Sequence, residues 1–183
     1  MSLDFSGKNV VVTGGARGIG LTFVKSLVSL GANVLVLDKM FDTSLFGDSL
    51  KNITMFEIDL SKKNEFARLL SFVSEKYDKI DIVINNAGVT FPSSGDEPYP
   101  ITYWETTLNV NLTAPFMVIS TLLPYLQKSN AASIINIASL NSELGFPNNP
   151  AYVASKSALA GLTRSFAVDF GKYGIKFIKA PVF

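Results

Sequence analysis

Cysteine and histidine are both absent from the 183 residues of this chain. Their absence excludes a thiol nucleophile, a disulfide framework, an imidazole base and the usual zinc sites. We therefore expect no bound metal ion. Any side chain that takes up a proton during a reaction must belong to another residue type.

The chain also has little excess charge and no long hydrophobic run. Its 16 basic and 15 acidic residues give a net charge of +1, with no basic cluster to bind nucleic acid or an anionic membrane. The N-terminal residues do not resemble a signal peptide, and the apolar runs are too short or too interrupted to span a bilayer. These features predict a cytoplasmic protein whose partners are small molecules, not nucleic acids or membranes. The length fits one domain over residues 1–183.

Six short apolar runs rich in β-branched residues lack the polar alternation of half-exposed strands. They lie at about 9–13, 33–37, 53–58, 80–85, 133–138 and 175–180, and such strands are buried on both faces. Segments with helical spacing lie between most of them, at about 18–30, 62–77, 103–128 and 152–172. The connection at 39–52 is short and broken, which predicts a turn or a single helical turn. This order predicts an α/β fold, a Rossmann-like doubly wound parallel sheet with helices on both faces.

The last predicted strand is unusual because the sequence stops directly after it. The strand runs into Ala180-Pro181-Val182-Phe183 and would leave one edge of the sheet uncovered, which natural folds usually avoid. We therefore expect a chain that is cut short at its C-terminus, with the final strand or strands of the fold missing.

A glycine-rich turn joins the first predicted strand to the first predicted helix. Its sequence is Thr13-Gly14-Gly15-Ala16-Arg17-Gly18-Ile19-Gly20. Glycine is needed where a side chain would keep the backbone from a pyrophosphate or the helix from the strand, and the helix N-terminus offers free N–H groups to phosphate. The turn predicts a dinucleotide site that includes Gly14, Arg17, Gly18, Ile19 and Gly20. An ordinary tight turn is the alternative, since the spacing differs from the usual Gly-x-Gly-x-x-Gly.

Two acidic residues at strand ends bear on which dinucleotide binds. Asp38, eighteen residues after Gly20, can accept hydrogen bonds from the adenosine ribose and would repel a 2′-phosphate, which favours NAD. Arg17 has the opposite effect, because a guanidinium there can bind the extra phosphate of NADP. Asp59-Leu60 can meet the adenine edge, although Asp59 followed by Ser61 also fits a helix cap. We expect NAD, with NADP possible; a solvated turn residue is the alternative for Asp38.

A tyrosine and a lysine open the last long predicted helix. Tyr152 and Lys156 are spaced i, i+4, which places the phenol and the ammonium on one face. A free phenol, with a pKa of about 10, is a poor base near neutrality, and a nearby positive charge favours phenolate. Such a tyrosine can exchange a proton with an alcohol or a carbonyl. Ser139 is placed to hold the substrate oxygen, with Ser142 as the alternative. A surface Tyr–Lys pair is the other interpretation.

A third motif, Asn85-Asn86-Ala87-Gly88, follows the fourth predicted strand. Together with the glycine turn and with Ser139, Tyr152 and Lys156, it resembles the classical short-chain dehydrogenase/reductases over essentially all of the chain. The resemblance implies that Asn86, Ala87 and Gly88 flank the cofactor.

The same resemblance implies a role for each member of a catalytic tetrad. Tyr152 is the acid/base, Ser139 polarises the carbonyl, and Lys156 also binds the nicotinamide ribose. Asn111 is the fourth member, where it holds a water that connects Lys156 to solvent as a proton relay; without the resemblance, a polar residue at a helix kink is the alternative. A homo-oligomer is also implied, a dimer or tetramer built on the helices at about 103–128 and 152–172.

The sequence departs from the family near its end, where Pro181-Val182 stands in place of a Pro-Gly turn and no substrate-covering segment follows. Losing that lid exposes the reaction to water. Two hypotheses therefore stand: an NAD(P)-dependent alcohol dehydrogenase or ketone reductase, and an impaired member that acts as a nucleotide-binding or assembly module. Related epimerases and dehydratases are disfavoured by the glycine spacing. Phe91, Leu140, Leu144 and Phe146 suggest an apolar substrate wall, although each also fits a core position.

Overall fold

Six parallel strands form one sheet. The computed structural model describes residues 3–182, apart from the side chains of residues 48–50, so Met1, Ser2 and Phe183 of the predicted domain and C-terminal edge lie outside the described residues. The strands are β1 (Asn9–Thr13), β2 (Asn33–Asp38), β3 (Ile53–Glu57), β4 (Ile82–Asn85), β5 (Ser133–Ser139) and β6 (Lys176–Val182). They pair in the order β3-β2-β1-β4-β5-β6. The predicted doubly wound, Rossmann-like sheet is confirmed.

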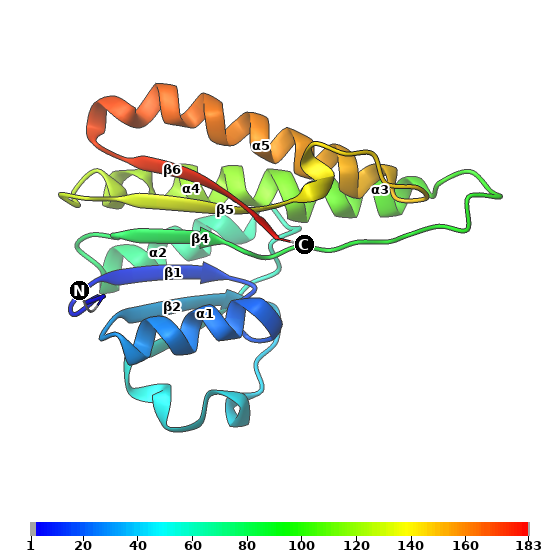
Figure 1. Cartoon of the computed structure of the whole chain (residues 1–183). Coiled ribbons are helices and arrows are strands. Elements are labelled where there is room, and N and C mark those ends of the chain that lie inside the picture. Colours follow the sequence, from blue (N-terminus) through cyan, green and yellow to red (C-terminus); the bar gives the residue numbers. More distant parts are fainter. Residues whose placement is uncertain (1–2, 183) are drawn as a thin grey trace.

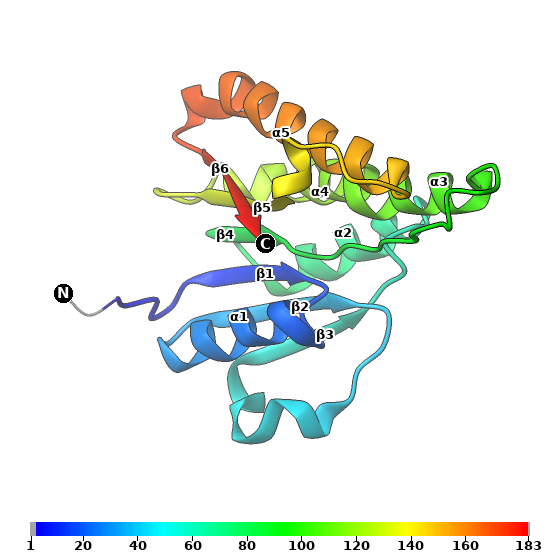
Figure 2. The ribbon, with the colours of Figure 1, turned by 45° about the vertical axis from the view of Figure 1, so that its right-hand side comes forward.

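Helices cover both faces of the sheet. They are α1 (Gly18–Ser29), α2 (Glu65–Lys76), α3 (Ile101–Leu108), α4 (Ala114–Leu126) and α5 (Pro150–Phe170). One core joins α1 and the 3-10 segment η1 (Thr43–Asn52) to the sheet, and a larger core joins α2, α4 and α5 to the opposite face. Figures 1 and 2 show the resulting three layers. The inner strands β1, β2, β4 and β5 are largely buried because crossover helices pack on each side. The prediction of burial on both faces is wrong for the two edge strands, since β6 has no buried residue and β3 has only Phe56.

The structure corrects the predicted boundaries at several points. Helix α2 begins at Glu65, three residues later than expected, and β4 begins at Ile82. The connection expected to be a turn contains ten 3-10 residues with a kink at Gly47, whose φ of 56° is left-handed. The long helix expected at 103–128 is interrupted by the π-helical turn η2 (Asn109–Thr113), which separates α3 from α4.

The run Ile101–Leu126, which holds α3, η2 and α4, is long and apolar enough to cross a membrane by length and composition alone. Its apolar residues have another use here. Val118, Ile119, Leu122 and Leu126 are fully buried against the sheet and its neighbouring helices. An apolar helix of this kind is common in the core of a globular domain. Packing in the core therefore accounts for the apolar residues of this run. A cytoplasmic location stays a prediction.

The strand order reverses between β1 and β4, since the chain crosses to one side after β1 and to the other after β4. In open α/β sheets, ligands bind beyond the carboxyl ends of the strands at such a reversal. The turn after β1, the end of β2, the segment after β4 and the end of β5 all meet there (Figure 1). The predicted site residues lie on these segments, on the helices beside them or, for Asp59 and Leu60, in the turn after β3.

Candidate active site

The glycine turn after β1 is shaped by close backbone approaches. Gly14 has a φ of 63°, and a Cβ on it would lie 2.8 Å from the Cα of Ala87. A Cβ on Gly20 would lie 2.1 Å from the carbonyl oxygen of Gly14, so no larger residue fits at either position. Gly18 also has a left-handed φ, 55°, but a Cβ there would meet nothing within 4 Å. The structure therefore packs Gly14 and Gly20 against protein and leaves open space beside Gly18.

The N-terminus of α1 faces this open space without a cap. Arg17 is the N-cap residue, and its side chain makes no capping hydrogen bond. The first N–H groups of a helix have no partner within the helix, and together with the helix dipole they attract anions. The turn thus presents the backbone N–H groups of the first turn of α1 beside Gly18, where no side chain would block a ligand.

The segment after β4 holds the glycine turn in place. The amide nitrogen of Asn86 donates to the carbonyl oxygens of Thr13 at 3.1 Å and Gly14 at 3.0 Å. In return, the Thr13 hydroxyl accepts from the backbone N–H groups of Asn86 and Ala87, both at 3.0 Å. Four hydrogen bonds therefore join two of the predicted motifs, the glycine turn and Asn85-Asn86-Ala87-Gly88, and hold them side by side.

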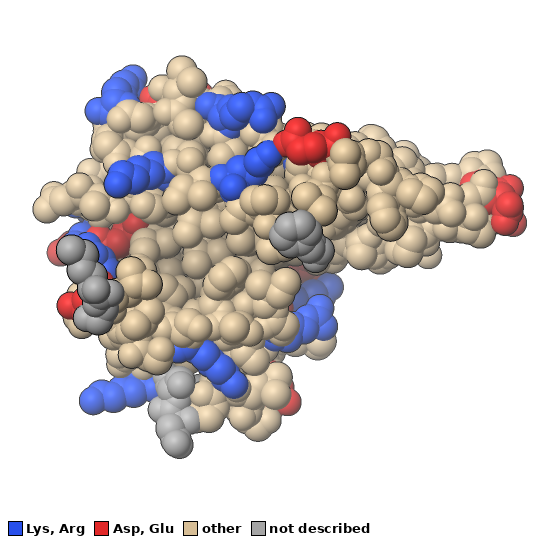
Figure 3. Space-filling model, viewed as in Figure 1, with Lys and Arg blue, Asp and Glu red and all other residues tan. Residues whose placement is uncertain are grey.

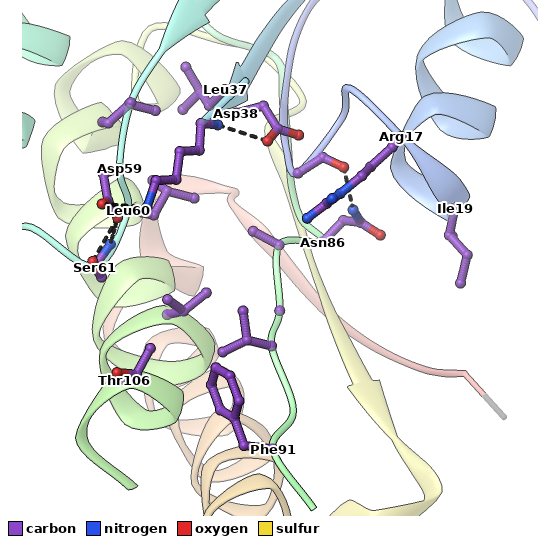
Figure 4. Close-up of a pocket in the computed structure, with 17 residues that line it drawn as sticks. Arg17, Ile19, Leu37, Asp38, Asp59, Leu60, Ser61, Asn86, Phe91 and Thr106 are labelled. Carbon is purple, nitrogen blue, oxygen red and sulfur yellow. Dashed lines mark hydrogen bonds and ion pairs between the residues drawn. The ribbon is translucent and has the colours of Figure 1, made fainter. Parts of the chain in front are cut away.

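Asp38 serves the glycine turn as well as the cleft. One carboxylate oxygen accepts from the backbone N–H of Ala16 at 3.0 Å, and the other accepts from that of Lys39 at 2.7 Å. Arg17 stays exposed on the other side of the opening. Figure 4 shows Asp38 and Arg17 near the same end of the cleft, with Phe91 and Thr106 at the far end.

Asp59 is held by its own turn. Its carboxylate accepts from the hydroxyl and N–H of Ser61, and Lys39 lies 3.2 Å away. The Ser61 hydroxyl bond, assisted by Lys39, lowers the pKa of Asp59 in spite of partial burial. The N-cap residue of α2 is Asn64, so the helix cap suggested for Asp59 is not what forms. Asp59 instead closes a turn that brings Leu60 to the cleft wall.

A cleft of about 490 Å³ unites most of the predicted dinucleotide residues. Its lining includes the predicted Gly14, Arg17, Ile19, Asp38, Asp59, Leu60, Asn86, Ala87 and Gly88. Sequence reasoning missed Leu37, Lys39, Ile58, Ser61, Val89, Thr106 and Val110, which line it too. Most of these directly adjoin predicted residues in the chain, so a wider window around each motif would have found them. Val110 adjoins the predicted Asn111 in the same way, whereas Thr106 carries no such signal, because tertiary packing alone brings α3 to the cleft.

Asn111 lies in the π turn and is fully buried. Its side-chain oxygen accepts from the N–H of Val89 at 2.8 Å, and its amide nitrogen donates to the carbonyl of Val89 at 2.9 Å and to the Ser155 hydroxyl at 3.1 Å. Asn111 thus ties the helix of the Tyr–Lys pair to the segment after β4. Single-turn π bulges are frequent at functional sites.

Lys156 is an uncommon residue for the interior, since it is 4% exposed. Its Nζ donates to the carbonyl oxygen of Ile137 at 2.7 Å, and the same atom lies 5.7 Å from the centroid of the Tyr152 ring. Burial lowers the pKa of Lys156 to about 8. The phenol of Tyr152 is half-buried on the same helix face. Tyr152 and Lys156 are therefore not a surface pair, which was the alternative that their spacing allowed.

Ser139 ends β5 and is 8% exposed. It caps the short 3-10 helix η3 (Leu140–Ser142), because its hydroxyl accepts from the N–H of Asn141 at 3.2 Å while the Ser142 hydroxyl accepts from the N–H of Ser139 at 3.3 Å. Ser142 also binds α5, through the hydroxyl of Ser157, which donates to its carbonyl. Both serines are thus beside α5, but only Ser139 sits at the strand end itself.

The comparisons with known proteins agree with this geometry. The family described as short chain dehydrogenase matches the chain over residues 8–180. The chain belongs to this family. Among curated relatives, this short-chain dehydrogenase is 31% identical to the D-beta-hydroxybutyrate dehydrogenase of Rhizobium meliloti, over 92% of the chain and 67% of the relative. It is 34% identical to the L-fucose dehydrogenase of Mus musculus, over 94% of the chain and 63% of the relative.

The solved structures agree with the family. A Pseudomonas aeruginosa RhlG/NADP active-site complex superposes with a TM-score of 0.86 and 30% identity, over 96% of this chain and 72% of that one. This short-chain dehydrogenase therefore spans about two thirds of the length of the relatives that it matches. Within residues 3–182, no group of three or more carboxylates is placed to hold a metal ion.

Proposed function

We propose that this chain is an NAD(P)-dependent oxidoreductase that interconverts an alcohol and a ketone or aldehyde. The observation that carries the proposal is the buried Lys156 ammonium, which lies 5.7 Å from the Tyr152 ring with no carboxylate among its described partners. An isolated buried charge costs folding free energy. Its place beside a phenol at the carboxyl end of a parallel sheet gives it a chemical use, and the dehydrogenases named above supply the reaction class.

The cleft fits a nicotinamide dinucleotide. The open space beside Gly18 and the uncapped α1 N-terminus suit the pyrophosphate, and Asp38 with Arg17 lies where the adenosine ribose would be held. Asp59 and Leu60 would meet the adenine, and Asn86 to Gly88 would pass along the nicotinamide half. When bound, the cofactor supplies the hydride donor or acceptor. Asp38 makes NAD the proposed preference, and NADP remains possible through Arg17.

The four tetrad residues divide the proton chemistry among them. The Tyr152 hydroxyl takes the proton from the substrate alcohol, or returns it to the carbonyl oxygen in the reverse direction. Ser139 donates a hydrogen bond to the same substrate oxygen and holds it beside the phenol. Lys156 supplies the positive charge that favours phenolate and binds the nicotinamide ribose.

Asn111 connects this site to solvent. Its buried amide fixes the backbone of Val89 and reaches Ser155. We assign it the task of holding a water that passes protons between Lys156 and solvent.

The chain also fits a homo-oligomer, a dimer or tetramer, with α4 and α5 at the interface. Phe116 on α4 is 43% exposed and Val168 on α5 is 82% exposed. Figure 3 views the molecule from the side on which α4 lies behind the sheet, and there Lys and Arg side chains lie over α5 and β6. Exposed apolar side chains on neighbouring helices are typical of surfaces that associate.

The experiment has two stages. A fluorescence titration of the 183-residue chain with NADH and NADPH, together with its mass by light scattering, tests the cofactor and the assembly. Oxidation of L-fucose and D-beta-hydroxybutyrate is then followed in the wild-type chain, in Tyr152→Phe and in Tyr173→Phe, whose ring is exposed far from the cleft. Tyr152→Phe should bind NADH normally and lose at least about 10²-fold in turnover.

Each result has a distinct meaning. Equal turnover in Tyr152→Phe and the wild-type chain would disprove the acid/base assignment. Binding without turnover of any alcohol or ketone in a broader panel would favour a nucleotide-binding or assembly module. Failure to bind either dinucleotide would reject the cofactor site itself.

A further inference from the structure

Three polar side chains form a buried line below the site, on the sheet face that α5 covers. The Asn85 amide nitrogen donates to the side-chain oxygen of Asn136 at 2.8 Å, and the Asn136 amide nitrogen donates to the Thr163 hydroxyl at 2.9 Å. The Thr163 hydroxyl donates in turn to the carbonyl oxygen of Leu159 at 2.7 Å. The line therefore runs from β4 through β5 to α5. Its three members are 2%, 0% and 4% exposed.

Thr163 lies on the same face of α5 as the proposed catalytic pair. Positions 152, 156, 159 and 163 are spaced four, three and four residues apart, which makes one stripe along a helix. Lys156 and Thr163 on this stripe both bind β5, at the carbonyl of Ile137 and the side chain of the adjacent Asn136. The lysine tie uses a long flexible side chain, whereas the threonine tie is short and fixes the distance.

Stability alone does not explain the polar line. Its surroundings on this face are apolar, and the remaining side-chain oxygen of Asn85 is buried without a hydrogen-bond partner among the described residues. An unpartnered buried acceptor costs folding free energy, and well-packed apolar residues often do better than a buried polar network. Such networks, when their bonds are directional, fix one arrangement of the elements they join.

We infer that Asn136 and Thr163 are positioning residues, which set the register of α5 on β5 so that Tyr152 and Lys156 stand at the carboxyl end of the sheet in the geometry required for proton transfer. Neither residue touches the cleft. Each acts through the helix, and Asn85 connects the same line to the strand whose next residue, Asn86, holds the glycine turn. The catalytic consequence rests on the proposed function, but the positioning itself does not.

The test compares Thr163→Val with two variants of matched chemistry. Thr163→Val removes the hydroxyl at nearly constant shape, and Thr163→Ser restores it. Thr107→Val makes the same change at a fully buried threonine of α3 whose hydroxyl has no described partner. The readout is the titration of the Lys156 side chain, followed by NMR with ¹³C at the lysine ε-carbon and assigned by the loss of its signal in Lys156→Met. Thermal unfolding, the NADH Kd and turnover complete the set.

The expected result separates position from stability. In Thr163→Val the titration midpoint of Lys156, about 8 in the wild-type chain, moves by about half a unit or more. The NADH Kd stays within about threefold, and kcat for an alcohol that the wild-type chain oxidises falls by about tenfold or more. Thr163→Ser and Thr107→Val match the wild-type chain. A Thr163→Val protein with lower thermal stability but an unchanged Lys156 titration would overturn the inference.

A second variant covers the case in which Thr163→Val does not fold. Asn85→Leu, Asn136→Leu and Thr163→Val together make the line apolar and leave none of its hydrogen-bonding groups unpaired. The combined variant should be at least as stable as the wild-type chain, yet show the altered Lys156 titration. An unaltered titration in this variant would also reject the inference. Because this readout needs neither cofactor nor substrate, a chain that turns over no alcohol would refute the proposed function and leave the positioning test decisive.

Discussion

Among the described residues, each end of the sheet buries one charged side chain, and the surroundings of the two side chains differ. At the amino end, Asp81 is 1% exposed and accepts from the N–H of Asn9 at 3.0 Å and the Ser129 hydroxyl at 2.7 Å. Lys79 adds a cation 3.3 Å from its carboxylate. At the carboxyl end, Lys156 is 4% exposed and has one neutral carbonyl as its described partner.

The different surroundings of Asp81 and Lys156 indicate that the amino end of the sheet contributes to stability and the carboxyl end to chemistry. Burial of Asp81 would raise its pKa, but the Ser129, Asn9 and Lys79 contacts outweigh burial and lower it. Nothing comparable offsets the burial of Lys156, so its pKa falls to about 8. A satisfied charge stabilises the fold, whereas an unsatisfied one is maintained at a cost and is typical of a functional site. This contrast predicts opposite responses to mutation at the two ends.

The largest effect is expected for Lys156→Met. Turnover should fall by at least about 10²-fold because the charge beside Tyr152 is lost. The free energy of unfolding at pH 7 should rise, by up to about 3 kcal/mol, since a pKa of about 8 in place of about 10.4 measures the cost of burying the ammonium. Alcohol oxidation and urea unfolding measure the two effects. The exposed Lys25→Met is the control and should change neither; loss of stability in Lys156→Met would contradict the comparison.

Asp81→Ala should have the opposite effect on stability. Removing the carboxylate leaves the Asn9 N–H and the Ser129 hydroxyl without their partner, which predicts a loss of about 2–4 kcal/mol in the free energy of unfolding. The NADH Kd of the folded protein should not change, because Asp81 lies at the far end of the sheet. Urea unfolding and NADH titration check both statements. The exposed Asp169→Ala is the control, and an equally small loss in the two variants would show that the Asp81 contacts contribute little.

The pH dependence of stability should also differ in sign between the two ends. The folded pKa of Lys156 lies below its unfolded value, so the unfolded chain binds more protons between about pH 8 and 10.4, and stability rises with pH in that window. The folded pKa of Asp81 is lowered, so its contribution is present above about pH 4 and is lost as the pH falls further. Unfolding curves of Lys156→Met and Asp81→Ala should lose the alkaline rise and the acid fall respectively. Persistence of either feature in its variant would assign it to other groups.

Sequence reasoning located the strands well and the helix ends less well. The strand at Asn9–Thr13 was placed correctly because a β-branched run followed by glycine has few alternatives. A helix kink was the alternative for Asn111, but the π geometry of the interruption at Asn109–Thr113 was not predicted, since nothing in that sequence requires it. In the fold, a pair of hydrogen bonds joins Asn111 of this turn to Val89, a contact between distant parts of the chain. The one-turn prediction for residues 39–52 failed because Gly47 permits a kink between two short helical pieces.

The sequence predicted which residues belong to the candidate site better than it predicted the contacts between them. Local spacing placed Tyr152 and Lys156 on one helix face. The structure brings Lys156 to the carbonyl of Ile137, near the end of β5, and 5.7 Å from the Tyr152 ring. The bond between Asp38 and Ala16 could not be inferred, because it joins residues 22 positions apart through the fold. The same holds for the line from Asn85 to Thr163. Spacing identifies groups that share an element, but partners across elements depend on packing.

The smallest predicted effect concerns Asp38, a charge that is half-buried and shared between the fold and the cleft. Asp38→Ala should weaken NAD binding by about tenfold, through loss of ribose hydrogen bonds, and NADP binding by less, because repulsion of the 2′-phosphate is also lost. The Ala16 bond adds a common loss for both, since the glycine turn is less well fixed. Titrations with NADH and NADPH give the ratio of the two Kd values. Asp42→Ala, which removes a carboxylate bonded only to the nearby Ser44 among the described residues, should leave both unchanged. An unaltered ratio in Asp38→Ala, with both affinities lower, would show that Asp38 braces the glycine turn and does not select the cofactor.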